Sequence, residues 1–222
     1  RMMGPVRWSF LSESHELYNN GHMYEAAVAW YEATGGRRDF LDVACRSADL
    51  VDRTFGPGPT QLKGVPGHEE IELALVKLYR VTGERRYLDL ARFFLDRRGL
   101  GRDPRGAQTQ NHLPVREQRE AVGHAVRANY LYCGMADVAA LMGDAGYIAA
   151  LDAIWNDVVS GKLHLNGGTG ARPGGEAYGA PYELPNDHGQ TYLETCATIA
   201  NALWNERMFR LKGEAKYIDV LE

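Results

Sequence analysis

Apolar residues recur at helical spacing along most of the chain, with polar residues between them. Such a pattern of three to four residues predicts amphipathic α-helices. Alternation of β-branched residues is scarce, so strands should be few and confined to loops. The clearest apolar stretches are Ala26, Ala27, Trp30 and Tyr31; Leu41, Ala44, Cys45, Ala48 and Val51; Ile71, Leu75, Leu78 and Tyr79; and Leu88, Ala91, Phe94 and Leu95.

A short motif recurs four times between these stretches. It consists of a glycine, three mostly polar residues, an aromatic residue, and then leucine or isoleucine. Glycine readily takes the left-handed conformation that ends a helix, so each copy predicts a helix, a tight turn and a second helix whose aromatic residue is anchored in the core. The copies begin at Gly36, Gly83, Gly143 and Gly213, and their aromatic residues are Phe40, Tyr87, Tyr147 and Tyr217. The sequence therefore predicts four helix pairs, a repeat architecture.

Three segments rich in glycine and proline separate the pairs: residues 55–67, 99–114 and 166–187. A loop of about 20 residues within a compact domain is usually functional or disordered. The third segment contains aromatic residues and two glutamates, Glu176 and Glu183, which favours function. Glu176 follows two glycines, and a carboxyl group on such a loop is a candidate general acid/base, although a solvated surface glutamate is the alternative.

A second pattern concerns the start of each pair. We expect Gly21-His22, Gly67-His68 and Gly123-His124 to precede the first helix of three pairs, so that the histidines converge on one pocket. The alternative is that the histidines only cap helices. In the fourth pair this place is taken by Glu194 and Cys196, whose oxygen and sulfur suit zinc. Cys45 and Cys133 fall in apolar helical patterns and are interpreted as core residues.

The composition of the chain excludes some classes of function. The 222 residues carry a net charge of −4, which gives no basic surplus for nucleic-acid binding. No apolar run is long enough to cross a membrane, and the first residues lack the features of a signal peptide. Three scattered cysteines make no disulfide framework, so we expect a reducing, cytoplasmic location.

Several longer motifs together resemble glycoside hydrolase family 127, the β-L-arabinofuranosidase family. The resemblance covers essentially the whole chain, and the motifs occur in the family's order. They are His15-Glu-Leu-Tyr-Asn-Asn-Gly-His22, Gly64-Val-Pro-Gly-His68, Pro114-Val-Arg-Glu-Gln118, Ala121-Val-Gly-His-Ala-Val-Arg127, Tyr182-Glu-Leu-Pro-Asn186 and Glu194-Thr-Cys196.

The resemblance implies an all-α fold, an (α/α)6 barrel, and a retaining glycosidase that acts on arabinose-containing oligosaccharides or glycoconjugates. It implies a zinc ion held by one glutamate and three cysteines, one of which is the nucleophile. By the same resemblance Glu176 is the general acid/base and Glu194 and Cys196 are the first two zinc ligands. His68 and His124 match sugar-contacting histidines, and either His15 or His22 matches a third.

The chain also departs from the family. No cysteine follows Cys196, whereas family members carry a downstream cysteine pair and C-terminal β-sandwich domains. We therefore expect residues 1–222 to form one incomplete barrel domain of about four helix pairs, with exposed apolar edges, that cannot catalyse the reaction alone. Homo-oligomerisation stays open. Two other hypotheses remain: an enzyme of the same fold acting on a different sugar, and a non-catalytic helical-repeat binding module.

Overall fold

The structure, a computed structural model, describes residues 6–101, 105–188 and 192–222. Eight α-helices occur in this part of the chain as four consecutive pairs. Extended structure among the described residues is limited to isolated bridges, namely Phe55 with Leu62, His124 with Ala177 and Arg172 with Ala177. The all-α class and the confinement of extended structure to loops are thus confirmed. The chain divides into two compact units, residues 1–97 and 98–222.

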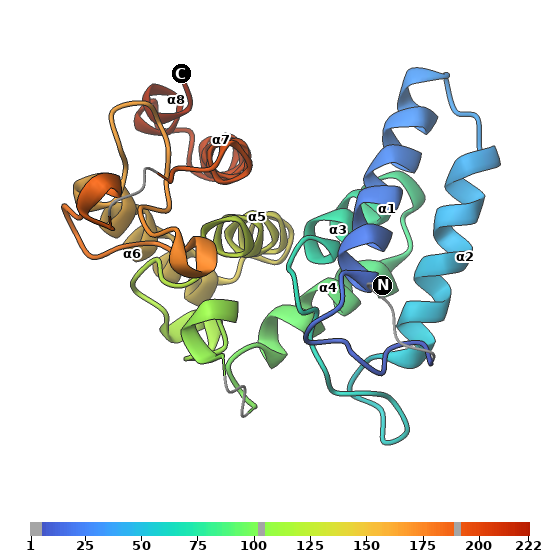
Figure 1. The fold of residues 1–222 in the computed structure, drawn as a ribbon. Helices are drawn as coiled ribbons and strands as arrows, with labels where there is room; N and C mark the ends of the chain where they lie inside the picture. Colours follow the sequence, from blue (N-terminus) through green and yellow to red (C-terminus); the bar gives the residue numbers. More distant parts are fainter. Residues whose placement is uncertain (1–5, 102–104, 189–191) are drawn as a thin grey trace. The chain divides into compact units, whose positions relative to one another are not determined.

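The first unit contains two helix pairs. Helices α1 (Glu16–Ala33) and α2 (Asp39–Thr54) form one pair, and α3 (Ile71–Thr82) and α4 (Arg85–Arg97) form the other. Besides pairing with its own partner, α1 packs against α3 (Figure 1). The first helices of the two pairs are therefore neighbours, which is the arrangement expected of stacked helix-pair repeats.

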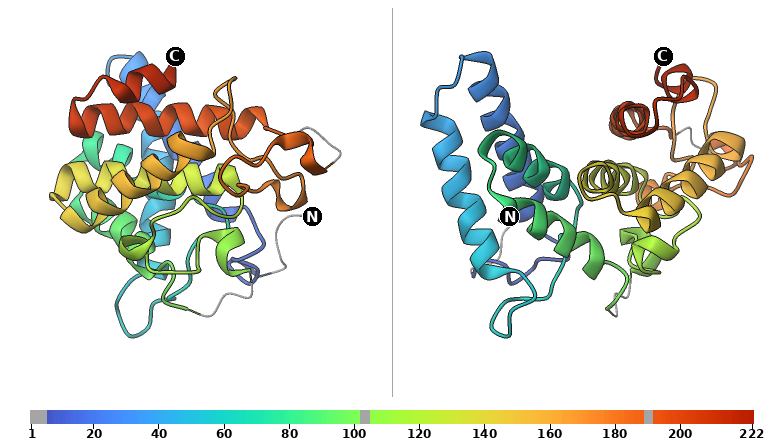
Figure 2. Two further views of the ribbon diagram at one scale, coloured as in Figure 1. Left: turned by 90° about the vertical axis from the view of Figure 1, so that its left-hand side faces the viewer. Right: turned by 180° about the vertical axis from the view of Figure 1, so that it is seen from behind.

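The second unit repeats this arrangement with longer connections. Its α-helices pair as α5 (Ala125–Met142) with α6 (Ala145–Gly161) and α7 (Thr195–Lys212) with α8 (Lys216–Leu221), and α5 packs against α7 (Figure 2). Four short 3₁₀ helices lie in the connections: η1 (Gly106–Thr109), η2 (Val115–Glu117), η3 (Gly174–Glu176) and η4 (Pro185–His188).

Helices α5 and α2 differ in burial in the way their packing requires. Helix α5 is buried almost all round, because it has neighbours on more than one side. It carries an unbroken buried stretch from Leu131 to Ala139. Helix α2 buries only the stripe formed by Leu41, Ala44, Ala48 and Val51, and its other face is polar. A helix that is apolar all round is a buried helix, and one with a single apolar stripe lies at the surface.

The turn glycines behave as the repeat predicts. Gly83, Gly143 and Gly213 directly follow the last residues of α3, α5 and α7, with φ of 75°, 66° and 73°. The first pair differs, because α1 ends at Ala33 and the left-handed glycines are Gly35 and Gly36.

The predicted aromatic anchors are confirmed in three of the four copies. Tyr87, Tyr147 and Tyr217 are buried. Phe40 is only half-buried, so the prediction is wrong for the first copy. The reason is its register on α2, where the buried stripe begins one residue later, at Leu41.

Two further expectations concern surfaces. None of the helices formed by the described residues is long and apolar enough to span a lipid bilayer. Helix α7 exposes Ile199, Leu203 and Phe209, an apolar surface of the kind expected at an open edge. That residues 1–222 form one incomplete barrel stays a prediction, since it depends on how the two units are joined.

The turn glycines give a first testable prediction. An added Cβ at Gly143 would meet no atom within 4 Å, so only the left-handed backbone opposes a side chain there. We expect Gly143→Ala to lower the free energy of unfolding by roughly 1–2 kcal/mol, measured by chemical denaturation. The control is Gly101→Ala, which has equally open space without a positive φ. Equal stability of the two variants would contradict this account of the turn.

Candidate active site

Each first helix of a pair begins at a titratable residue. The N-cap residues are His15 for α1, Glu70 for α3, His124 for α5 and Glu194 for α7. The backbone N–H groups of a first helical turn have no partner within the helix, and they favour polar or negatively charged groups. The start of each first helix is therefore a position where side-chain chemistry gathers, as the sequence pattern indicated.

The Gly-His pairs mark this position in only one repeat. His124 is an N-cap, but His68 lies two residues before the N-cap Glu70, and His22 lies in the second turn of α1. The prediction that His22 precedes its helix is wrong, because α1 already begins at Glu16. The histidine that occupies the N-cap of α1, as His124 does in α5, is His15.

The central contact of the second unit joins His124 to Glu176. The imidazole Nε2 lies 2.7 Å from a carboxyl oxygen of Glu176, and the side chain of His124 is 12% exposed while that of Glu176 is 47% exposed. Glu176 has a left-handed backbone with φ of 53°, directly after Gly175 with φ of 74°. A glutamate held in this strained conformation and half open to solvent can exchange a proton with a bound molecule.

The hydrogen bond made by the Nδ1 atom of His124 determines the tautomer of its ring. Nδ1 accepts a hydrogen bond from the backbone N–H of Arg127, at 3.5 Å, so the ring proton is on Nε2 and is donated to Glu176. Burial lowers the pKa of His124 and the Arg127 guanidinium adds to this, whereas the carboxylates of Glu176 and Glu194 partly oppose it. The imidazole is therefore neutral over a wider pH range than a free histidine.

The loop that carries Glu176 is tied to the start of α5 by its backbone. His124 bridges to Ala177, and the Tyr178 N–H donates to the Gly123 carbonyl at 2.8 Å. Glu183, the other glutamate of this loop, receives two hydrogen bonds of 2.7 Å from the guanidinium of Arg172. The pair of Glu183 and Arg172 thus joins two parts of the same loop, which supports a structural role for Glu183.

A buried hydrogen-bond network lies below this loop. The Tyr178 hydroxyl donates to the Asn129 side-chain carbonyl at 2.7 Å. The Asn129 amide donates in turn to the Ala197 carbonyl of α7 at 3.1 Å and to the Thr169 hydroxyl at 3.3 Å. Asn129 therefore connects α5, the loop and the first turn of α7, and fixes the loop relative to both helix starts.

Glu194 and Cys196 lie together at the start of α7, as predicted. The Tyr192 hydroxyl donates to the Glu194 carboxylate at 3.2 Å, and Cys196 is exposed. Hydrogen bonding to Glu194 is the main cause that raises the pKa of the Cys196 thiol. One carboxylate and one accessible thiol therefore face the same region. Of the cysteines interpreted as core, Cys133 is buried and Cys45 is half-buried.

In the first unit, three of the predicted sugar-contacting histidines gather around one aromatic ring. The Tyr18 ring centroid lies 4.3 Å from that of His68, 4.4 Å from that of His22 and 5.5 Å from that of His15. His15 and His68 are themselves 5.5 Å apart. Of the three histidines whose convergence was predicted from the sequence, His22 and His68 therefore lie close together, and His15, which the resemblance gave as an alternative to His22, joins them. That they share a pocket with His124, which belongs to the other unit, stays a prediction.

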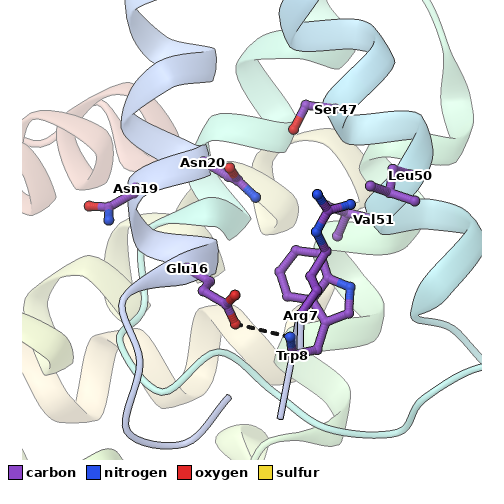
Figure 3. Close-up of a pocket in the computed structure, with 8 residues that line it drawn as sticks. All are labelled: Arg7, Trp8, Glu16, Asn19, Asn20, Ser47, Leu50 and Val51. Carbon is purple, nitrogen blue, oxygen red and sulfur yellow. Dashed lines mark hydrogen bonds between the residues drawn. The ribbon is translucent and has the colours of Figure 1, made fainter. Parts of the chain in front are cut away.

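Sequence reasoning missed the group behind His22. Glu25 and Glu70 face its ring, and the Lys77 ammonium pairs with Glu25. A signal was available, because Glu25 is one helical turn after His22, and Glu69, Glu70 and Glu72 stand at the start of an otherwise apolar helical stretch. Nearby, a hollow of about 310 Å³ opens between α1, α2 and the N-terminal segment. Its lining combines the Trp8 indole with polar groups of Arg7, Glu16, Asn20 and Ser47 (Figure 3).

The chain matches a family of glycoside hydrolases. The model of the β-L-arabinofuranosidase GH127 catalytic domain matches residues 4–222. The chain belongs to this family, and the expectation from its motifs is confirmed.

Individual relatives agree with the family model. The chain is 39% identical over 238 residues to the non-reducing end β-L-arabinofuranosidase of Bifidobacterium longum subsp. longum, a match that covers 97% of this chain and 35% of that protein. Among solved structures it is similar to a GH127 β-arabinofuranosidase (55% identity, TM-score 0.94, 100% of this chain and 34% of the other). It is also similar to a GH127 β-L-arabinofuranosidase from Geobacillus stearothermophilus T6 (44%, TM-score 0.91, 97% and 36%). The chain thus spans about a third of the length of these relatives.

The buried network under the loop provides a second testable prediction. Tyr178→Phe would leave the buried Asn129 carbonyl without its hydroxyl donor, so we expect a loss of about 1–3 kcal/mol in the free energy of unfolding. Tyr182→Phe is the matched control, since Tyr182 is 80% exposed and should tolerate the change. If both variants unfold at the same denaturant concentration, Asn129 does not hold the loop.

The His124–Glu176 pair provides a third prediction. Histidine NMR titration should give His124 a pKa below the value of about 6.5 typical of a free imidazole, because burial and Arg127 disfavour the charged ring. Glu176→Gln removes a carboxylate that favours the charged ring, so it should lower this pKa further. A rise of the pKa in Glu176→Gln would contradict the pairing.

Proposed function

We propose that the protein containing this chain is a retaining β-L-arabinofuranosidase that acts on arabinose-containing oligosaccharides or glycoconjugates. The observation that carries the proposal is the 2.7 Å contact between His124 and Glu176, in the same compact unit as Glu194 and Cys196. The names of the related enzymes support the substrate class.

In this proposal Glu176 is the general acid/base. It would donate a proton to the leaving glycosidic oxygen, and later accept one from the attacking water. The Nε2–H of His124 holds one carboxyl oxygen of Glu176, which leaves the other oxygen for the proton transfer. His68 and either His15 or His22 are proposed to bind sugar hydroxyls, whereas both ring nitrogens of His124 already have partners, Glu176 and the backbone N–H of Arg127.

Glu194 and Cys196 are proposed as two of four zinc ligands. Their chemistry fits, because a carboxylate and an accessible thiol lie together at a helix start, and zinc binds both oxygen and sulfur. The remaining ligands, including the nucleophilic cysteine, would come from outside this chain. A bound zinc would supply a thiolate at neutral pH.

The roles of Glu176 and Cys196 can be separated in the full-length protein. With an aryl β-L-arabinofuranoside as substrate, we expect Glu176→Gln to lower kcat/KM about 10²–10⁴-fold, because proton transfer is lost, while zinc content stays near one per chain. Cys196→Ser should lose the zinc.

Cys45→Ser is the control, since Cys45 is on the polar-faced helix α2 and should leave both readouts unchanged. Retention of full activity in Glu176→Gln would contradict its role as acid/base. If neither zinc nor turnover is found, the chain is better explained as a binding module, and turnover of a different glycoside would indicate another sugar specificity. Cysteine-dependent turnover by residues 1–222 alone would contradict the expectation that this segment cannot catalyse the reaction.

A further inference from the structure

The short 3₁₀ helix η1 lies against the backbone that carries Glu176. The side-chain amide of Gln108, in η1, donates a hydrogen bond to the carbonyl of Gly175. A Cβ atom built on Gly175 would lie 2.8 Å from the amide oxygen of Gln108 and 3.0 Å from its amide nitrogen. The amide group of Gln108 therefore occupies the space in which any other residue at position 175 would have its side chain.

The backbone of Gln108 contacts the histidine that pairs with Glu176. The N–H of His124 donates to the Gln108 carbonyl at 3.3 Å. Next to this bond, a Cβ atom built on Gly123 would lie 1.9 Å from the Ala107 carbonyl oxygen and 2.7 Å from the Cα of Gln108. Gln108 thus lies between the two segments that carry His124 and Glu176, and it is hydrogen-bonded to both segments.

The direction in which Glu176 points depends on an uncommon backbone conformation. Gly175 and Glu176 both have left-handed φ values, 74° and 53°. For a residue with a side chain this conformation is unfavourable, and it persists only where the surroundings enforce it. The Gly175 carbonyl belongs to the peptide plane that joins the two residues. A hydrogen bond to this carbonyl therefore restrains ψ of Gly175 and φ of Glu176, the torsions that direct the glutamate.

We propose that Gln108 is a positioning residue: its amide holds the peptide plane between Gly175 and Glu176, so that the Glu176 carboxyl group stays against Nε2 of His124. This proposal rests on the proposed function, because that function makes Glu176 the general acid/base. A general acid must lie within hydrogen-bond reach of the leaving oxygen. A residue that orients the acid therefore acts on the rate of the chemical step more than on substrate affinity.

Gln108→Met in the full-length protein tests the side chain separately from the backbone. Methionine has a similar length but cannot donate to Gly175, and the backbone carbonyl that binds the His124 N–H is retained. Gln108 is half-buried, so the variant should fold, which chemical denaturation checks. The readouts are steady-state kinetics on an aryl β-L-arabinofuranoside and the pKa of His124 by NMR titration, with the His124 signals assigned by their loss in His124→Asn.

We expect Gln108→Met to lower kcat about tenfold and to leave KM within about twofold of wild type, because proton transfer from Glu176 occurs in the transition state. In the Glu176→Gln background the same substitution should change kcat less than about twofold, since the group that Gln108 positions is already absent; a double-mutant cycle measures this difference. The pKa of His124 should fall, as in Glu176→Gln, because the carboxylate that favours the charged ring has moved away.

Gln61, in the first unit, provides the matched control. Its side-chain amide donates to the backbone carbonyls of Asp52 and Phe55 at 2.7 Å and 2.9 Å, so it also ties a loop together. Gln61→Met should lower the free energy of unfolding, because these hydrogen bonds are lost, without changing kcat or the pKa of His124. The control therefore separates a loss of stability from a loss of positioning.

Two results would overturn the proposal. If Gln108→Met keeps the wild-type kcat and the wild-type pKa of His124, Gln108 only packs against Gly175. If Gln108→Met lowers kcat by the same factor with and without the Glu176 carboxyl group, Gln108 acts through another part of the protein. An unchanged kcat in Glu176→Gln would count against the proposed function instead. The pKa of His124 is measured without turnover, so it would still decide whether Gln108 places Glu176.

Discussion

The packing of first helices against each other is the constraint on which the rest of the structure depends. Each second helix carries the chain back along its partner, so α1 and α3 begin close together, as do α5 and α7. The contact between His15 and His68 and the bond from Asn129 to the Ala197 carbonyl show this within each unit. Helix starts offer unpaired N–H groups, and their concentration makes these ends the place for polar chemistry.

The core and the site then make opposite demands on the same helices. Buried helices such as α5 need apolar surface on several sides, yet their first turns carry ionisable side chains. The structure meets both demands by keeping charge at the N-cap and one turn beyond, and by pairing the polar groups that lie deeper. Asn129 illustrates this, since it is fully buried and has partners in two other segments.

Features encoded locally could be read from the sequence. A left-handed glycine after a helix leaves a local signature, so the turns at Gly83, Gly143 and Gly213 were predictable. The sequence placed Glu194 and Cys196 correctly at a helix start, because Glu194 is the N-cap of α7 and Cys196 lies in its first turn. Helix α1 was predicted to begin later than it does because Gly21 resembles a helix-start glycine. What distinguishes it is the lack of space for a side chain, because a Cβ atom built on Gly21 would lie 1.4 Å from a carboxyl oxygen of Glu70, which belongs to another helix pair. The links from Tyr178 to Asn129 and from Lys77 to Glu25 span 49 and 52 residues, and no local pattern encodes such partners.

The close approach of Gly21 to Glu70 also affects how mutational data on this domain should be read. In a saturation library scored by activity, position 21 would tolerate change as poorly as a reactive residue, although glycine has no side chain to take part in a reaction. Its intolerance would measure the space reserved for a neighbouring acid. Sensitivity to substitution alone therefore does not separate residues that react from those that make room for them.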